Sequence, residues 1–384
     1  MRRGFRRWSG TCAALLIGIS AACAGDGDDG ADPSGDGDAA AIGLDEIQVL
    51  AAHNAYHLEG DPKLLAVITD NLPELTPTIE YSHPTLTEGL ELGLRSFELD
   101  LFEDPDGGRY GAPVAQSVLG LEPIDPVMQE PGFKVFHIQE VDFRSTCLTF
   151  VACLTELEAW SRDNPDHLPI VIHLEVKDGV IPDPLDLSFV QPIPTSAGTF
   201  SAVEEEIHSV LDDEQLVTVA DVQGDADTLR TAIEADGWPD VDDLRGRFVF
   251  VLDDHGAKRE LYRNLYPDTL DRLIFVDAQP PEDDAAFTVL NDPVADGDRI
   301  RELVAKGYLV RTRTDADTVE ARSGDTTRRE AAFASGAQLV STDYEVEDPR
   351  WPGFVTDLPG EGAARCNPVS APDGCTAEAV AEDT

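Results

Sequence analysis

Short apolar runs rich in strand-forming residues recur eight times along this chain, and helical patterns separate many of them. The runs cover 49–52, 96–102, 133–138, 170–176, 248–252, 273–276, 308–312 and 338–342. Helical patterns occupy 85–92, 149–160, 202–211, 228–235, 298–305 and 326–335. This alternation predicts one catalytic α/β domain over 42–360, built as a (β/α)8 TIM-type barrel with some irregularity.

A doubly wound open sheet is the rival architecture. Neither GxGxxG nor GxxxxGK[ST] follows any predicted strand, which disfavours its nucleotide-binding versions. The link 253–272 is short for a full crossover helix, so we expect it to be irregular. The Pro-containing stretches 60–84 and 178–200 are predicted to be loops over one mouth of the barrel.

The N-terminal segment predicts export. Four arginines lie among the first seven residues, and an apolar run too short to span a bilayer follows, so 1–22 is predicted to be a signal peptide. Ser20-Ala21-Ala22-Cys23 resembles a bacterial lipoprotein cleavage box, which implies lipidation of Cys23 and anchoring at the cell envelope. The alternative is ordinary signal-peptidase cleavage nearby, which would release a secreted protein.

Residues 23–41 are dominated by Gly, Asp and Ala. Such a stretch buries little apolar area, so we expect a flexible, self-repelling linker. A calcium loop is the alternative, because aspartates alternate with glycine. The segment lacks the closing Glu of a calcium-binding helix-loop-helix.

The charge balance restricts the partners. The chain has 28 Lys+Arg against 75 Asp+Glu, for a formal net charge of −47. This disfavours nucleic-acid binding and electrostatic adhesion to anionic lipid, so the N-terminal lipid is the expected membrane contact. We expect the protein to be a monomer.

Four cysteines remain when Cys12 leaves with the signal and Cys23 takes the lipid. They fall in two close pairs, so local pairing is favoured among three connectivities, which suits an oxidising compartment. Neither pair has the CxxC spacing of a zinc site. The second pair lies in a predicted C-terminal tail, 361–384. The expected disulfides are Cys147–Cys153 and Cys366–Cys375.

Polar residues stand at the ends of the predicted strands. Glu98 and Asp100 share one face of 96–102, and a second polar face runs along 173–177. A parallel barrel strand is normally apolar on both faces, and its carboxyl end forms the reactive mouth. We therefore expect convergence of His53, Asn54, Glu98, Asp100, His137, Glu175 and Lys177.

This set has a definite chemistry. Three carboxylates and an amide oxygen favour Ca²⁺, with Mg²⁺ as the second option. The two histidines, His53 and His137, titrate near neutral pH and suit proton transfer. A cation that offsets phosphate charge, a base and an acid together indicate cleavage of a phosphodiester.

Other residues have simpler interpretations. Ordinary surface or core positions suit His83, His167, His208 and His255. His53 and His57, at i and i+4, would suit zinc on a helix, but no HExxH accompanies them. Glu140 and Asp142 are interpreted as loop carboxylates. The alternative is that they contact and support the active-site residues.

Several motifs resemble one family. In chain order over about 45–355, the sequence resembles the bacterial calcium-dependent branch of phosphatidylinositol-specific phospholipase C. The motifs are His53-Asn54-Ala55-Tyr56-His57, Arg95-Ser96-Phe97-Glu98-Leu99-Asp100, Phe136-His137, His173-Leu174-Glu175-Val176-Lys177-Asp178, the stretch 310–317 and Ser341-Thr342-Asp343-Tyr344.

The resemblance implies a role for each matching residue. His53 would be the general base on the inositol 2-hydroxyl and His137 the general acid for the diacylglycerol oxygen. Lys177 would meet the phosphate or the ring hydroxyls, Arg311 or Arg313 the anionic headgroup, and Tyr344 would stack on the ring. The implied product is a cyclic inositol phosphate, with or without further hydrolysis. The implied Ca²⁺ ligands are Asn54, Glu98, Asp100 and Glu175.

Two other functions remain open. Glycerophosphodiester phosphodiesterases and other metal-dependent phospholipases of similar barrel also carry an ExD pair, but they typically open with His-Arg-Gly, whereas Asn54-Ala55 follows His53 here. A tethered lipoprotein that only binds a polyol phosphate is the non-enzymatic alternative. It would have no need of two histidines beside a metal site.

Overall fold

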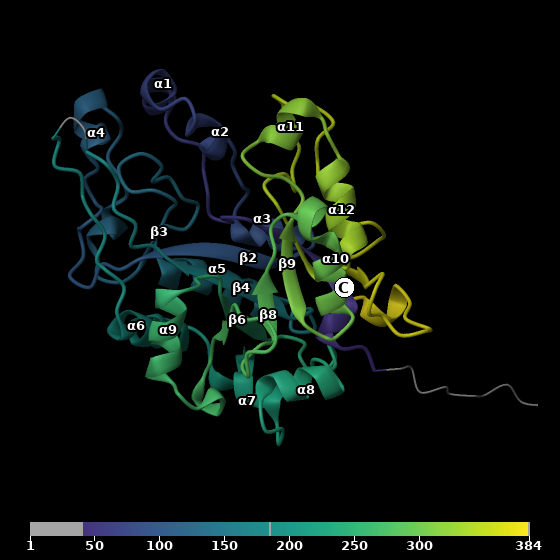
Figure 1. Ribbon diagram of the computed structural model, residues 1–384. Coiled ribbons are helices and arrows are strands. Elements are labelled where there is room, and N and C mark those ends of the chain that lie inside the picture. The colour runs from purple at the N-terminus through teal and green to yellow at the C-terminus, as the bar shows by residue number, and fades with distance from the viewer. Residues whose placement is uncertain (1–40, 184–185, 383–384) are drawn as a thin grey trace, which may run out of the picture. The chain divides into compact units, whose positions relative to one another are not determined.

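The computed structural model describes residues 41–183 and 186–382 (Figure 1). The predicted signal peptide, nearly all of the predicted linker and Cys23 lie outside the described residues. The described residues belong to one compact unit. Within the described ranges, none of the helices combines the length and hydrophobicity needed to cross a bilayer.

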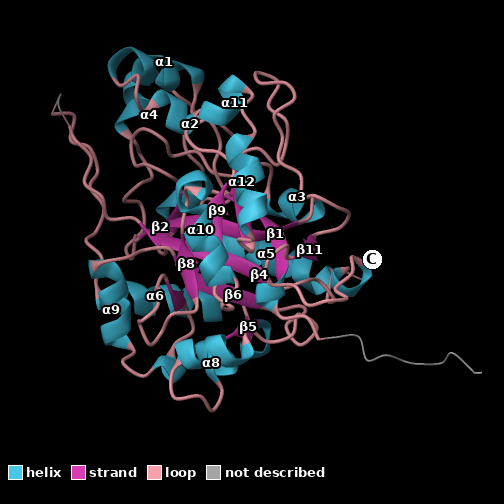
Figure 2. Ribbon diagram, turned by 45° about the vertical axis from the view of Figure 1, so that its right-hand side comes forward, coloured by secondary structure: helices cyan, strands magenta, loops and turns pink. Residues whose placement is uncertain are grey.

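Parallel strands form the centre of the molecule (Figures 1 and 2). They follow one another in the order β5-β6-β4-β2-β1-β10-β9-β8, and β7 also pairs with β6. Their bounds are β1 (Ile47–Ala52), β2 (Leu94–Phe102), β4 (Ile170–Val176), β5 (Leu216–Val217), β6 (Phe248–Leu252), β7 (Phe275–Val276), β8 (Phe287–Val289), β9 (Leu309–Arg313) and β10 (Leu339–Thr342).

The two ends of this strand path meet. β5 pairs with the start of β6 and β7 with its end, so the two short strands share one position beside it. An isolated parallel bridge between Asp277 and Phe287 then links β7 to β8. The predicted α/β barrel is confirmed. Its irregularity lies at β5 and β7, two short strands that together occupy one barrel position.

Helices surround the strands, as Figure 2 shows. The predicted helical segments correspond to α3, α5, α6, α8, α10 and α12, which begin and end within a few residues of expectation, except that α6 and α10 begin about five residues earlier. The helices are α1 (Pro62–Asn71), α2 (Thr76–Ile79), α3 (Leu86–Glu91), α4 (Val114–Leu119), α5 (Phe150–Asp163), α6 (Ala197–His208), α7 (Val219–Gln223), α8 (Leu229–Asp236), α9 (Ala257–Leu265), α10 (Pro293–Val304), α11 (Val319–Ser323) and α12 (Thr327–Ser335).

Three local predictions were wrong. The segment 133–138 contributes only β3 (Lys134–Val135), which pairs antiparallel with the end of β2 and so takes no position among the parallel strands. The unpredicted β8 takes a barrel position instead. The link expected to be irregular contains α9, and the stretch 60–84 contains α1 and α2.

The alternation along β2 is confirmed. Phe97, Leu99 and Leu101 are buried in the main apolar core. Glu98 and Asp100 alternate with them and are also buried, so they face the inside of the barrel. A charged pair in this position requires partners, which the site supplies.

The C-terminal segment is part of the domain rather than a separate tail. β11 (Ala364–Cys366) pairs antiparallel with β1, and the guanidinium of Arg95 binds the carboxylate of Glu382. Both predicted disulfides, Cys147–Cys153 and Cys366–Cys375, are present. The boundary expected at residue 360 is therefore not a structural boundary.

Candidate active site

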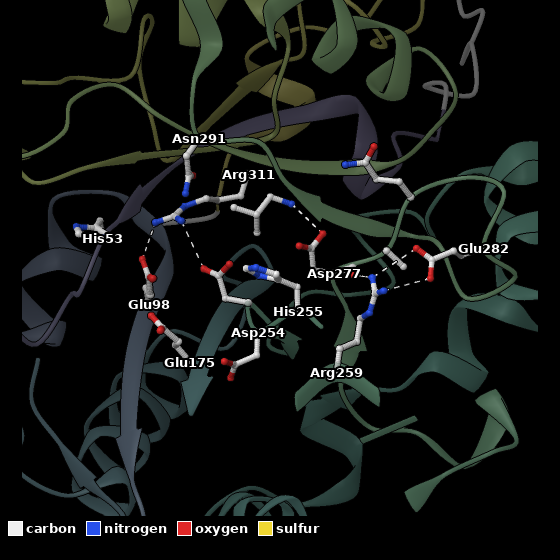
Figure 3. A pocket seen from close by; sticks show the side chains of 14 residues that line it. His53, Glu98, Glu175, Asp254, His255, Arg259, Asp277, Glu282, Asn291 and Arg311 are labelled. Atoms are coloured by element: carbon white, nitrogen blue, oxygen red, sulfur yellow. Dashed lines mark hydrogen bonds and ion pairs between the residues drawn. The ribbon is translucent and has the colours of Figure 1, made fainter. Parts of the chain in front are cut away.

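A cavity of about 660 Å³ opens at the carboxyl ends of the strands. In Figure 3, His53, Glu98 and Glu175 lie at one end, and Arg259 and Glu282 lie at the other. This is the mouth predicted from the strand-end residues. The lining residues are His53, Glu98, Glu175, Asp253, Asp254, His255, Arg259, Asp277, Ala278, Gln279, Glu282, Val289, Asn291 and Arg311.

His53 is held by a carboxylate and faces a guanidinium. Its Nδ1 lies 2.7 Å from Oδ1 of Asp343, and its Nε2 lies 3.2 Å from Nη1 of Arg313. Because Arg313 only donates, Nε2 must accept and Nδ1 carries the proton. Burial, together with the charge of Arg313, holds the pKa of His53 well below its usual value. His53 is therefore a neutral base.

The parallel register brings these two residues together. Ala52 of β1 pairs with Thr342 of β10, and the amide of His53 donates to the carbonyl of Thr342. His53 directly follows β1 and Asp343 directly follows β10, so the pairing of the two strand ends places these residues side by side. Arg313 also donates to Oδ2 of Asp343 at 2.9 Å, so Asp343 accepts from both.

His137 is held by a second carboxylate. A tight turn with two backbone hydrogen bonds between Ile138 and Asp142 returns Asp142 to His137, whose Nδ1 lies 2.8 Å from Oδ2. Nε2 of His57 lies 2.7 Å from the same oxygen. Burial opposes ionisation of Asp142, but His57 and the bond from His137 hold its pKa below the usual value.

The two predicted catalytic histidines lie at the same end of the barrel. Tyr81 lies between their neighbourhoods: its ring centroid is 4.2 Å from that of His57 and 6.2 Å from that of His53. The rings of His57 and His137 are 5.9 Å apart. The interpretation of His53 and His57 as a zinc pair on a helix was wrong, because residues 53–56 form a turn.

Three carboxylates converge at the end of the cavity that also holds His53. β2 and β4 pair Asp100 with Glu175, so both side chains project from adjacent strands at one level. Glu98, Asp100 and Glu175 each offer an oxygen, and these atoms lie within 4.8 Å of one another. The parallel sheet explains how residues 75 positions apart share one site.

Cations neutralise these carboxylates in part. Nζ of Lys177 lies 3.0 Å from Asp100 and 3.1 Å from Glu175, and Nη2 of Arg311 lies 2.5 Å from Glu98. Burial opposes ionisation of Glu98, but Arg311 lowers its pKa overall. Burial raises the pKa of Asp100 to about 8 despite Lys177.

The donor set fits a divalent cation that prefers oxygen ligands. Asp100 is completely buried, and its Oδ1 receives no hydrogen bond from any described residue. Asn54 is buried, with a backbone φ of 48°, and the amide of the next residue, Ala55, donates to the carbonyl of Glu98 at 3.0 Å. Carboxylate and amide oxygens without nitrogen or sulfur donors favour Ca²⁺ over zinc.

The predicted substrate-binding residues divide into two groups. Lys177, Arg311 and Arg313 all lie at the site, where each pairs with a carboxylate. Tyr344 does not line the cavity: it is 1% exposed, and its ring meets Trp351 and Phe354 edge-on. The stacking role expected for Tyr344 is therefore wrong as the site stands.

Some site residues were missed or undervalued. Asp343 directly follows the predicted strand 338–342 and belongs to the motif Ser341-Thr342-Asp343-Tyr344, so its position at a strand end could have indicated a role in the site. Asp142 binds His137, in agreement with the supporting role predicted as its second interpretation. His255 was predicted to be an ordinary surface or core residue, but it lines the cavity. Tyr81 carried no sequence signal, because its segment has no periodic pattern.

A family model described as phosphoinositide phospholipase C, Ca²⁺-dependent, matches residues 42–368. The chain belongs to this family. The resemblance drawn from the strand-end motifs is thereby confirmed. Members of the family are calcium-dependent phosphodiesterases, so this phospholipase C is an enzyme with Ca²⁺ as its cofactor.

Solved structures of this family share the fold. The calcium-dependent phosphoinositol-specific phospholipase C of Pseudomonas sp., in its apo form, is 17% identical, with a TM-score of 0.51, over 85% of this chain and 95% of that one. The same enzyme as a myo-inositol complex is 16% identical, with a TM-score of 0.51, over 85% and 96%. No curated protein sequence gives a significant match to this chain.

Proposed function

We propose that this phospholipase C cleaves phosphatidylinositol between the glycerol oxygen and phosphorus. The observation that carries the proposal is a pair of imidazoles, each bound through Nδ1 to a buried carboxylate, at the barrel mouth that also holds a cluster of three carboxylates. Each imidazole then directs its Nε2 away from its carboxylate, and Nε2 of His53, which accepts from Arg313, would accept from the substrate hydroxyl in its place. Such a pair suits one base and one acid.

The chemistry uses the two histidines in turn. Nε2 of His53 takes the proton of the inositol 2-hydroxyl, whose oxygen attacks phosphorus. The bond from phosphorus to the diacylglycerol oxygen breaks, and Nε2 of His137 gives that oxygen a proton. The products are diacylglycerol and a 1,2-cyclic inositol phosphate. Reversal of the roles with water would open the ring to the linear phosphate.

The remaining residues would bind charge. Glu98, Asp100, Glu175 and the amide of Asn54 would hold Ca²⁺, which neutralises phosphate oxygens and favours ionisation of the attacking hydroxyl when bound. Arg313, at 3.2 Å from Nε2 of His53, is placed to bind a phosphate oxygen near the reacting hydroxyl. Lys177 balances Asp100 and Glu175.

The outer part of the cavity supports an inositol ring without further phosphates. Six carboxyl groups and two guanidinium groups line the cavity. Ring hydroxyls donate well to carboxylates, whereas ring phosphates would be repelled by them. Phosphatidylinositol itself is therefore the proposed headgroup rather than its phosphorylated forms.

Export and anchoring extend the proposal. The N-terminal sequence supports a signal peptide and lipidation at Cys23, which would hold a monomeric enzyme at the cell envelope. The two disulfides agree with an oxidising compartment outside the cytosol.

The decisive experiment incubates the purified chain with labelled phosphatidylinositol, with and without calcium. Release of cyclic inositol phosphate only with calcium supports the proposal, and release of glycerol phosphate would instead favour a glycerophosphodiester phosphodiesterase. Loss of turnover in His53→Ala and His137→Ala assigns the activity to this site. If neither lipid is turned over by the unaltered chain or by either histidine variant, the result favours the non-enzymatic alternative, a protein that only binds a polyol phosphate.

A further inference from the structure

The ring of Tyr81 lies beside both His53 and His57, the second of which shares a carboxylate with His137. It is 2% exposed and lies in an extended segment after α2. Two hydrogen bonds hold this segment against the turn after β1: the amide of His83 donates to the carbonyl of His57 at 2.9 Å, and the amide of Glu59 donates to Oγ of Ser82 at 2.9 Å. These two hydrogen bonds thus fix the position of Tyr81.

The hydroxyl of Tyr81 contacts Asn54. Nδ2 of Asn54 donates to this hydroxyl at 3.0 Å, and Oδ1 of Asn54 accepts from the hydroxyl of Tyr56 at 3.3 Å. The amide is therefore oriented from both ends. The backbone of Asn54 is left-handed, with φ of 48°, a conformation that asparagine tolerates better than most residues other than glycine.

The ring of Tyr81 contacts the side of the site that holds His137, the proposed general acid, through His57. It stacks on His57 with centroids 4.2 Å apart and an interplanar angle of 27°. Nε2 of His57 shares Oδ2 of Asp142 with His137. The ring thereby holds the His57–Asp142–His137 chain in place from behind.

We infer that Tyr81 is a positioning residue with two separable parts. Its hydroxyl orients the amide of Asn54 for Ca²⁺, and its ring keeps His137 aligned through His57 and Asp142. The inference rests on the proposed function. Residues that orient metal ligands through hydrogen bonds commonly change metal affinity or activity by about 10–100-fold when altered.

Two substitutions separate the parts. Tyr81→Phe removes the hydroxyl and keeps the ring, so calcium affinity should fall by about tenfold, while kcat at saturating calcium stays near that of the unaltered enzyme. Tyr81→Leu also removes the ring, so kcat at saturating calcium should fall as well. Tyr308→Phe is the matched control, because it removes a buried tyrosine hydroxyl that binds Glu234 instead.

Calcium affinity is measured without substrate, by titration calorimetry and by the calcium-induced rise in Tm. The rise in Tm is referred to each variant's own calcium-free value, so modest destabilisation does not obscure it. Unchanged calcium affinity in Tyr81→Phe, beside clearly weakened binding in Glu98→Gln, would overturn this inference alone. An unaltered chain that binds no calcium in either measurement would overturn the proposed function together with it.

Discussion

The imidazole of His53 and the carboxylate of Asp343, 290 positions apart in the chain, lie 2.7 Å apart at the mouth of the barrel. The parallel pairing of β1 with β10 brings them together, since each directly follows the last paired residue of its strand. With Nδ1 bound to Asp343, Nε2 of His53 carries the lone pair, which accepts from Arg313. Proton transfer by His53 should therefore depend on Asp343.

Replacement of Asp343 tests this dependence. Asp343→Asn should lower kcat by about tenfold or more, whereas His53→Ala should lower it by about 10²–10⁴, the usual share of a general base. Steady-state assays on phosphatidylinositol, with Tm to verify folding, measure both effects. Asp348→Asn changes a carboxylate in the same loop that pairs with Arg350, and it should leave kcat unchanged. An unaltered kcat in Asp343→Asn would refute the orienting role.

Calcium removal should abolish turnover, and magnesium should restore little of it. Mg²⁺ requires a smaller, near-octahedral set of ligands than a cluster of three carboxylates and an amide provides. Glu98→Gln should raise the calcium concentration needed for half-maximal activity. Asp298→Asn, which removes a surface charge on α10, should not. Full activity in chelator would exclude the calcium assignment.

Headgroup charge should govern substrate choice. We expect kcat/KM for phosphatidylinositol to exceed that for its 4,5-bisphosphate by about tenfold or more, because like charges facing each other at a binding site cost several kcal/mol. Glu282→Lys, at the outer end of the cavity, should narrow this ratio, and Asp298→Lys should leave it unchanged. Equal kcat/KM values for both lipids would contradict the acidic cavity as a selectivity filter.

A buried pair behind the active site predicts a pH-dependent stability. Nδ1 of His83 lies 2.7 Å from Oε1 of Glu345, and both side chains are nearly inaccessible. Burial acts against the charged imidazole, but Glu345 outweighs it, so the pKa of His83 is raised above 6.5. The folded state therefore binds the proton more tightly, and this contribution to stability is complete below pH 6.5 and is lost as pH rises through the raised pKa.

Urea unfolding at about pH 6 and about pH 8.5 measures this linkage. The difference in the free energy of unfolding between the unaltered chain and His83→Gln should be larger at the lower pH. Glu345→Gln removes the other member of the pair, and its loss of unfolding free energy should likewise be larger at the lower pH. A difference that is equal at both pH values would mean that His83 does not carry the proton in the folded protein.

Much of the site follows from local patterns. The two-residue period of 96–102 already places Glu98 and Asp100 on one face, opposite the apolar residues that the core buries. The spacing of the four cysteines predicts both disulfides because close pairs close short loops. These properties depend only on neighbouring residues, so they are visible in the sequence.

Partners distant in sequence follow from the register of strands and from loop paths. The pairing of β1 with β10 selects Asp343 for His53, and the turn at 138–142 selects Asp142 for His137. Tyr344 and Tyr81 show the same limit: the first is buried against Trp351 and Phe354, and the second, without a motif, lies beside His53 and His57.

The sequence alone determined the barrel, the polar strand ends and the chemistry of a cation beside two imidazoles, because side-chain alternation is a property of each strand by itself. The tertiary structure decided which carboxylate orients which histidine and which aromatic ring reaches the site. Those choices depend on how strands and loops far apart in the chain pack against one another, and no local pattern encodes that packing.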